Sequence, residues 1–251
     1  MIPKPEDWGP RISVSGFYFL PLASDYTPPS SLQTFLDAGS PPIYIGFGSI
    51  VIDDPKSLTL LLLEAVRLAG VRAIISAGWS GLGDLDMPPE IHMIADCPHD
   101  WIFQRVSCVV HHGGAGTTAA AIAAGKSSVV VPFFGDQPFW GNMIARAGAG
   151  PEPIPFKNLT AINLAGAIET ALGSSMQERS HSLGDLVNDE EGVEAGIRSF
   201  YQQLNLSLLQ CSLTPMSAAT WRIRKTDIRL GSTSSALLID TGMLDLDKLE
   251  L

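Results

Sequence analysis

Residues 109–120 read VVHHGGAGTTAA, so an apolar run meets an alanine-rich one through two histidines and three glycines. An apolar β-branched run that ends in glycines and continues into an alanine-rich segment is typical of a strand that turns directly into a helix. Strands alternating with helices predict a parallel sheet with helices on both faces, and hence an α/β, Rossmann-like doubly wound fold. The pattern recurs, with strands expected at 42–49, 71–76, 91–96, 107–112 and 127–134 and helices at 55–69, 116–124, 137–147 and 160–172.

The rest of the chain divides around this core. Residues 1–40 hold six of the 18 prolines without a sustained period, which indicates a linker or leader. Residues 41–204 are expected to form one Rossmann-like domain that becomes helical from about residue 174. Residues 205–251 combine the basic cluster WRIRKTDIR with a weakly apolar tail, and we interpret them as a C-terminal extension, helical in part, whose structure the sequence does not specify.

Charge and composition limit the classes of partner. The net charge of −10 and the isoelectric point near 4.8 argue against nucleic acid and against an anionic membrane surface, so a phosphate site must be local. The longest apolar run carries Glu64 and Arg67, and no signal peptide or transmembrane segment is expected. Three cysteines without a CxxC pair indicate neither a disulfide framework nor a metal site. A cytoplasmic protein without a metal cofactor is the expectation.

The glycine-rich turn after residue 110 is the first candidate site. Unpaired amides at a helix N-terminus favour an anion, and open α/β sheets bind ligands at the carboxyl ends of their strands. Gly113, Gly114 and Gly116 allow close approach of a phosphate, and Thr117 adds a hydroxyl donor. Adjacent histidines on a strand point to opposite faces, so one faces the site and the pair does not share a metal. The alternative is a tight turn whose glycines serve packing alone.

A second candidate is the segment FFGDQPFWGN, residues 133–142. Asp136 and Gln137 offer acceptor and donor groups for a polyhydroxylated ligand, and Trp140 offers a flat face on which a sugar can stack. The alternative is that Asp136 caps the helix that follows.

Two further strand ends carry candidate residues. In GFGS, residues 46–49, Ser49 either reaches a phosphate or caps the helix near Pro55. In CPHDW, residues 97–101, His99 and Trp101 either flank a base or, for the tryptophan, belong to the core. In a parallel sheet all these ends share one edge, which predicts one elongated pocket for a base, phosphates and a polar tail.

Taken in order, PHDWIF, VVHHGGAGTT, VVVPFFGDQPFWGN and AGAGP resemble the C-terminal half of UDP-glycosyltransferases, most of all fungal-type sterol 3-beta-glucosyltransferases. The resemblance covers essentially the whole chain. It implies half of a two-domain GT-B fold that binds UDP-glucose as donor substrate. It also implies site residues: the diphosphate on His112, Gly114, Ala115, Gly116 and Thr117, with Ser49 nearby; uracil near Pro98 and His99; and the glucose hydroxyls on Asp136 and Gln137.

The sequence departs from the family pattern in two ways. Plant relatives have an asparagine and a glutamate where Gly116 and Ala120 stand, so the phosphate contact is expected from backbone, and the ribose contact is not assigned. In the family an N-terminal half binds the acceptor and supplies a histidine general base, and this chain is expected to begin in the interdomain linker. The implied reaction transfers glucose with inversion to a sterol or other lipid hydroxyl, and no catalytic residue is assigned to the chain itself.

Three functions stay open at this point. The first is the donor-binding half of a sterol glucosyltransferase that works with an N-terminal acceptor domain or subunit, and that reaches membranes through such a partner. The second is the donor subunit of a split enzyme, similar to the dolichol-pathway N-acetylglucosaminyltransferase. The third is a non-catalytic module that binds a nucleotide sugar.

Overall fold

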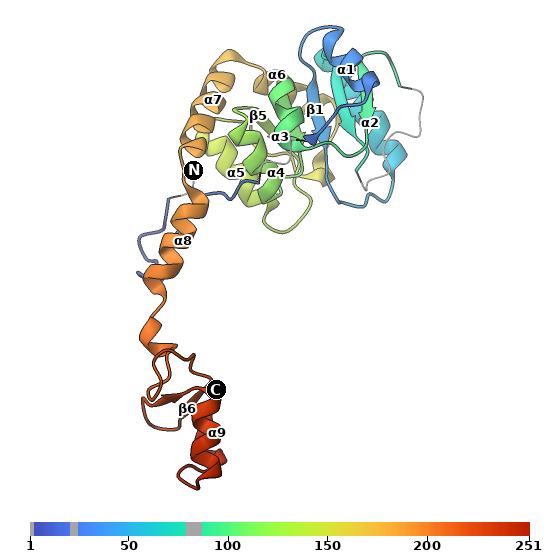
Figure 1. Cartoon of the computed structure of the whole chain (residues 1–251). Coiled ribbons are helices and arrows are strands. Elements are labelled where there is room, and N and C mark those ends of the chain that lie inside the picture. Colours follow the sequence, from blue (N-terminus) through green and yellow to red (C-terminus); the bar gives the residue numbers. More distant parts are fainter. Residues whose placement is uncertain (1–2, 21–24, 79–86) are drawn as a thin grey trace. The chain divides into compact units, whose positions relative to one another are not determined.

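Five parallel strands, in the order β3-β2-β1-β4-β5, form the sheet that the sequence predicts (Figure 1). The computed structural model describes residues 3–20, 25–78 and 87–251. Each strand coincides with one of the expected apolar runs, although each is only four residues long: β1 (Ile43–Gly46), β2 (Ala73–Ser76), β3 (Ile91–Ile94), β4 (Cys108–His111) and β5 (Ser127–Val130). The α/β doubly wound fold class is confirmed.

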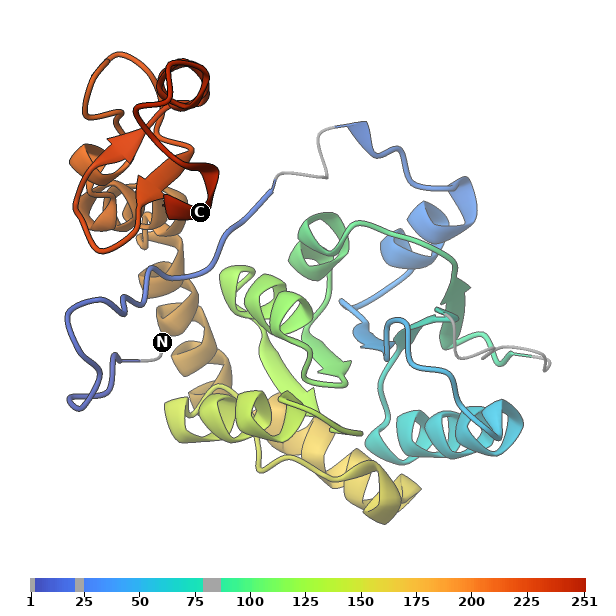
Figure 2. The same cartoon turned by 90° about the horizontal axis from the view of Figure 1, so that it is seen from below.

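Helices cover both faces of this sheet. The face covered by α2 (Pro55–Ala69) and α6 (Ala161–Ala171) buries Ile43, Ile45 and Val110 in one apolar cluster. These two helices lie next to each other on their side of the sheet (Figure 2, cyan and yellow). The opposite face is covered by helices that include α1 (Ser30–Asp37), α3 (His99–Ile102), α4 (Ala115–Ala123), α5 (Gln137–Ala147) and α7 (Ser174–Asn188).

Local signals set the ends of α2 as expected. The Asp54 carboxylate accepts a hydrogen bond from the Ser57 amide at 3.0 Å, and Pro55 occupies the first turn. Gly70 ends the helix with φ +62°, a conformation that costs other residues more. The expected helices at 137–147 and 160–172 are found as α5 and α6. Helix α1 lies in the segment expected to be a linker and was not predicted.

The chain separates into two compact units. The first comprises Met1–Asp7 and Val14–Val193, and holds the parallel sheet. The second comprises Trp8–Ser13 and Glu194–Leu251. None of the helices in the described residues has the length and apolar character needed to cross a bilayer.

The second unit contains strands as well as helices. After α8 (Gly192–Gln203), a three-stranded antiparallel sheet in the order β7-β6-β8 is built from short strands. Helix α9 (Ser232–Asp240) follows β7, and Cys211 and Leu230 are buried here. This sheet was not predicted, because its strands are two or three residues long: β6 (Trp221–Ile223), β7 (Arg229–Leu230) and β8 (Leu249–Glu250).

Candidate functional site

The strand order places a topological switch between β1 and β4. Strands β2 and β3 lie on one side of this pair and β5 on the other, so the connections leave β1 and β4 in opposite directions. The carboxyl ends of two such strands leave a crevice, which is where open α/β sheets bind ligands. The turn after β1 contains Gly48 and Ser49, and the turn after β4 contains His112, Gly113 and Gly114.

The two adjacent histidines lie in different surroundings. His111 is completely buried, whereas His112 is half-buried, and their ring planes are 90° apart. Nδ1 of His111 accepts a hydrogen bond from the Gly113 amide at 3.1 Å. Burial, reinforced by His112 and His99 nearby, lowers the pKa of His111 to about 3, so its imidazole is neutral at physiological pH.

His112 lies between the two turns. Its Cε1 is 3.2 Å from the point that a Cβ on Gly48 would occupy, and a Cβ on Gly114 would overlap its Nε2. Nε2 therefore faces the beginning of α4. Nδ1 is buried and has no hydrogen-bond partner among the described residues. Burial lowers the pKa of His112, and the Asp136 carboxylate opposes this shift, which also shows that Asp136 lies nearby.

The first turn of α4 presents its amides to this crevice. Gly114 is the N-cap residue and no side chain caps the helix. The Gly114 carbonyl accepts from the Thr118 amide at 2.9 Å, so the amides of Ala115, Gly116 and Thr117 precede the first intrahelical bond. Ala115 and Gly116 are exposed. This is the arrangement that favours binding of a phosphate group.

Asp136 and Gln137 begin α5 and serve different contacts. Asp136 occupies the N-cap position but does not cap the helix; its Oδ2 accepts from Nε1 of Trp140 at 2.8 Å. The proposed capping role is therefore wrong, and the carboxylate is exposed. Gln137 is buried, and its Oε1 accepts from the amides of Phe133 (2.7 Å) and Phe134 (3.2 Å). Its carboxamide oxygen thus braces the turn before α5.

The remaining candidates lie around the same crevice. Ser49 is exposed and does not cap α2, because Asp54 does. Pro98 is the N-cap of α3, and His99 stacks on Phe103 with ring centroids 4.6 Å apart. Burial lowers the pKa of His99, and His112 lowers it further, so the two rings are neighbours. Trp101 is buried against Tyr26 and belongs to the core rather than to a base platform.

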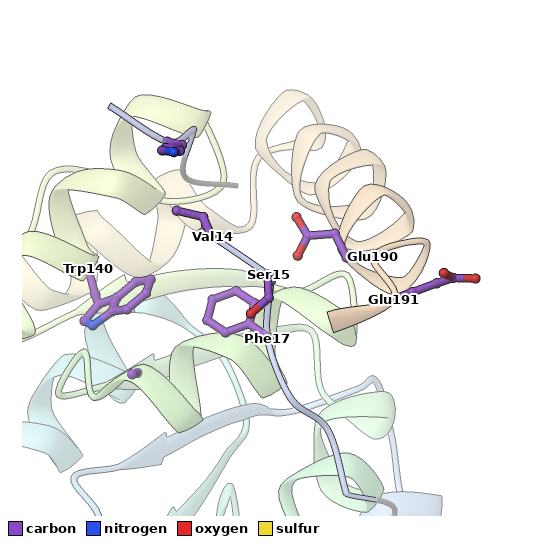
Figure 3. A pocket seen from close by; sticks show the side chains of 9 residues that line it. Val14, Ser15, Phe17, Trp140, Glu190 and Glu191 are labelled. Atoms are coloured by element: carbon purple, nitrogen blue, oxygen red, sulfur yellow. The ribbon is translucent and has the colours of Figure 1, made fainter. Parts of the chain in front are cut away.

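A cavity of about 510 Å³ adjoins the beginning of α4 and α5. Trp140 and Phe17 lie side by side along it, with ring centroids 5.7 Å apart, and Glu190 points toward the segment that carries Ser15 (Figure 3). Ala115, the first residue of α4, contributes to the same lining. The cavity therefore lies next to the first turn of α4 and combines aromatic side chains with carboxylates.

No group of three or more histidine, cysteine, aspartate or glutamate side chains could hold a metal ion in the described part of the chain. The crevice offers amides, imidazoles and one exposed carboxylate. Such groups bind phosphates and hydroxyls through hydrogen bonds.

The chain is similar to known glycosyltransferases. Residues 67–189 match the family model described as the erythromycin biosynthesis protein CIII-like C-terminal domain. Sterol 3-beta-glucosyltransferase UGT80A2 of Arabidopsis thaliana is 44% identical over 205 residues, which are 81% of this chain and 32% of the plant protein. The sterol 3-beta-glucosyltransferase of Emericella nidulans is 41% identical over 217 residues, 81% of this chain and 15% of the fungal protein. The chain contains the C-terminal domain of a UDP-glycosyltransferase.

Solved glycosyltransferases share the fold of this UDP-glycosyltransferase domain. The glycotransferase of kitacinnamycin superposes with a TM-score of 0.60 at 21% identity, covering 75% of this chain and 48% of that one. Arabidopsis thaliana UGT89C1 complexed with UDP superposes with a TM-score of 0.55 at 17% identity, covering 74% and 50%. These likenesses confirm the Rossmann-like half of a GT-B fold. The chain spans about a third of the length of the plant sterol enzymes and less of the fungal ones.

Sequence reasoning missed one residue of the crevice and one residue of the adjoining cavity. Gly48, with φ +63°, brings the β1 turn against His112, and its signal was its place in GFGS at a strand end. Phe17 lies beside Trp140, and no periodicity marked it, because its segment has no regular structure.

Proposed function

We propose that this chain binds UDP-glucose at the carboxyl ends of β1 and β4, as the donor-binding half of an inverting glucosyltransferase. The observation that carries the proposal is the uncapped N-terminus of α4, with Nε2 of His112 directed toward it. We assign the diphosphate to this helix end and to His112, with Ser49 at the rim. The uracil lies toward Pro98 and His99, and the glucose hydroxyls toward Asp136. Gln137 supports the sugar site through the turn that it braces.

The reaction we propose is a single displacement. The acceptor hydroxyl oxygen attacks the anomeric carbon of glucose while the bond from that carbon to the diphosphate oxygen breaks, and UDP leaves with the electron pair. The amides of α4 and the imidazole of His112 stabilise the negative charge that develops on the leaving diphosphate. A partner half, as a domain or a subunit, takes the proton from the acceptor; general-base assistance of this kind contributes about 10²–10⁴-fold.

We propose a sterol or another lipid alcohol as acceptor, following the names of the relatives. The cavity lined by Phe17 and Trp140 supports this assignment, because it adjoins α4. The indole of Trp140 also donates a hydrogen bond to Asp136. An alcohol held there lies beside the proposed glucose site. Lipid acceptors reside in membranes, and we propose that the chain reaches them through its partner half.

Calorimetric titration of the purified chain with UDP-glucose, UDP and ADP-glucose tests the donor proposal. We expect binding of UDP-glucose and of UDP, and weaker binding of ADP-glucose, because the larger purine must fit where the uracil lies. Absence of any binding at millimolar UDP-glucose contradicts the proposal. Binding of UDP without any transfer to a sterol, even when an N-terminal half from a relative is added, favours the non-catalytic module instead.

A prediction on sugar choice follows from the exposed carboxylate of Asp136. Asp136→Ala is expected to weaken UDP-glucose binding roughly tenfold, the loss of one hydrogen bond to a charged group, while UDP binding stays nearly unchanged. Calorimetry with both ligands measures the difference. Trp140→Phe is the matched control, since it removes the indole donor to Asp136 and keeps an aromatic ring. Equal losses for UDP and UDP-glucose in Asp136→Ala mean that the residue is structural.

A second prediction concerns the face toward the partner half. Phe134 and Phe139 flank the start of α5 and are 64% and 46% exposed, whereas Phe133 is partly buried and packs on Phe156 against the core. Exposed apolar side chains that cluster mark interaction surfaces. The chain is expected to self-associate in sedimentation experiments, and the double substitution Phe134→Ser and Phe139→Ser is expected to reduce this association. A parent chain that sediments as a monomer at all concentrations, with or without an added N-terminal half, contradicts this assignment.

A further inference from the structure

We propose that His111 is a positioning residue for the phosphate-binding turn. Its Nδ1 accepts a hydrogen bond from the Gly113 amide. This bond fixes the turn that positions His112 and the N-terminus of α4 toward the UDP-glucose. The inference rests on the proposed donor site. It assigns a role in binding to a side chain that is fully buried.

The main chain of His111 is fixed by the sheet. His111 pairs with Val130 in the parallel register of β4 and β5, and its carbonyl accepts from the Val131 amide at 2.8 Å. The side chain thus starts from a rigid strand end. The amide that donates to Nδ1 belongs to the peptide joining His112 to Gly113. The hydrogen bond therefore fixes the orientation of the first peptide plane beyond the sheet.

The turn itself has little room for another conformation. Gly113 has φ +85°, and a Cβ there would lie 2.7 Å from Cγ1 of Val130 and 2.8 Å from the carbonyl oxygen of Gln137. Its backbone is thus pressed between β5 and the first residue of α5. Gln137 in turn braces the turn before α5. The Gly113 peptide is therefore where the turn after β4 contacts the turn before α5.

The chemistry of the imidazole fits a positioning role better than a packing role. Because Nδ1 accepts a hydrogen bond from the Gly113 amide, the ring proton is on Nε2, and Nε2 is buried with no hydrogen-bond partner among the described residues. An unpartnered buried donor is unfavourable, and an aliphatic side chain of similar size would avoid it. What an aliphatic side chain does not supply is the acceptor for Gly113. The buried ring also stays neutral, so this acceptor is present throughout the physiological pH range.

Two substitutions of His111 separate the effect of its hydrogen-bond acceptor from the effect of its side-chain volume. In His111→Asn, Oδ1 can occupy the place of Nδ1 and accept from Gly113; His111→Leu fills similar space without an acceptor. Measured by calorimetry on the full chain, UDP-glucose affinity is expected to stay within about twofold of the parent in His111→Asn. It is expected to fall roughly 2- to 10-fold in His111→Leu, the range for one neutral hydrogen bond. His92→Leu is the control, because His92 lies on the edge strand β3 and stacks on Phe35.

A ligand-free measurement keeps the inference testable if His111→Leu does not fold. In the ¹⁵N-labelled parent chain, a scalar coupling across the hydrogen bond is expected between the Gly113 amide nitrogen and Nδ1 of His111. Its absence, or equal UDP-glucose affinity in folded His111→Leu and His111→Asn, overturns the positioning role. A parent chain that shows the coupling but does not bind UDP-glucose refutes the donor site and not the hydrogen bond.

Discussion

His112→Ala is expected to weaken the binding of UDP-glucose by roughly 10- to 150-fold, the equivalent of about 1.5–3 kcal/mol for a hydrogen bond to a charged group. Nε2 of His112 faces the beginning of α4, where the diphosphate is proposed to bind. The side chain sits against Gly48 as well, so both turns of the crevice lose a contact when it is removed. Calorimetric titration of parent and variant measures the change. UDP is expected to lose as much affinity as UDP-glucose, because the contact is to phosphate.

Comparison with His111 makes this prediction specific. His111→Ala is expected to cost much less affinity, since that ring touches the turn and not the ligand. Equal losses in the two variants mean that the diphosphate has been assigned to the wrong histidine. Unfolding of each variant by urea must accompany the titrations, because His111 is buried and its removal also leaves a cavity.

Much of the fold of the first unit was predictable because its signals are local. Asp54, Pro55 and Gly70 mark the ends of α2 through capping, a fixed φ and a left-handed conformation, each of which depends on neighbours in sequence. The five strands are short and mostly apolar, as expected for a sheet covered on both faces. The small sheet of the second unit has no such signal, because strands of two or three residues cannot show a period.

The position of the candidate turns was predictable, but their detail was less so. The glycine-marked turns expected from the sequence follow β1 and β4, and the two adjacent histidines differ in burial. The internal bonds of Gln137 and the approach of Gly48 to His112 depend on how turns distant in sequence pack together. Trp140 and Asp136 are four residues apart at the beginning of α5. This spacing allows their side chains to form a hydrogen bond but does not require it.

Acid is expected to destabilise the first unit through His111. The pKa of this buried imidazole is about 3, against a reference value of 6.5. Between these two values the unfolded chain binds more protons than the folded one, so the free energy of unfolding falls as the pH is lowered from 6.5 toward 3. At pH 4.5 the loss attributable to this residue is about 2–3 kcal/mol relative to pH 8. Urea unfolding at a series of pH values, followed through the amide signals of β4, measures it.

The same titration in His111→Asn isolates this residue from the other groups that titrate in acid. Burial also lowers the pKa of His92, His99 and His112, so the parent loses stability through four histidines as the pH falls. His111→Asn keeps the acceptor for Gly113 and removes one titrating ring, so its stability is expected to depend less on pH by the 2–3 kcal/mol estimated for His111. His92→Asn is expected to change the pH dependence less, because His92 is only partly buried. If His111→Asn and the parent lose the same stability between pH 8 and 4.5, the imidazole is protonated in the folded chain. In that state Nδ1 carries a proton and cannot accept from Gly113, so the hydrogen bond to Gly113 would be lost in acid.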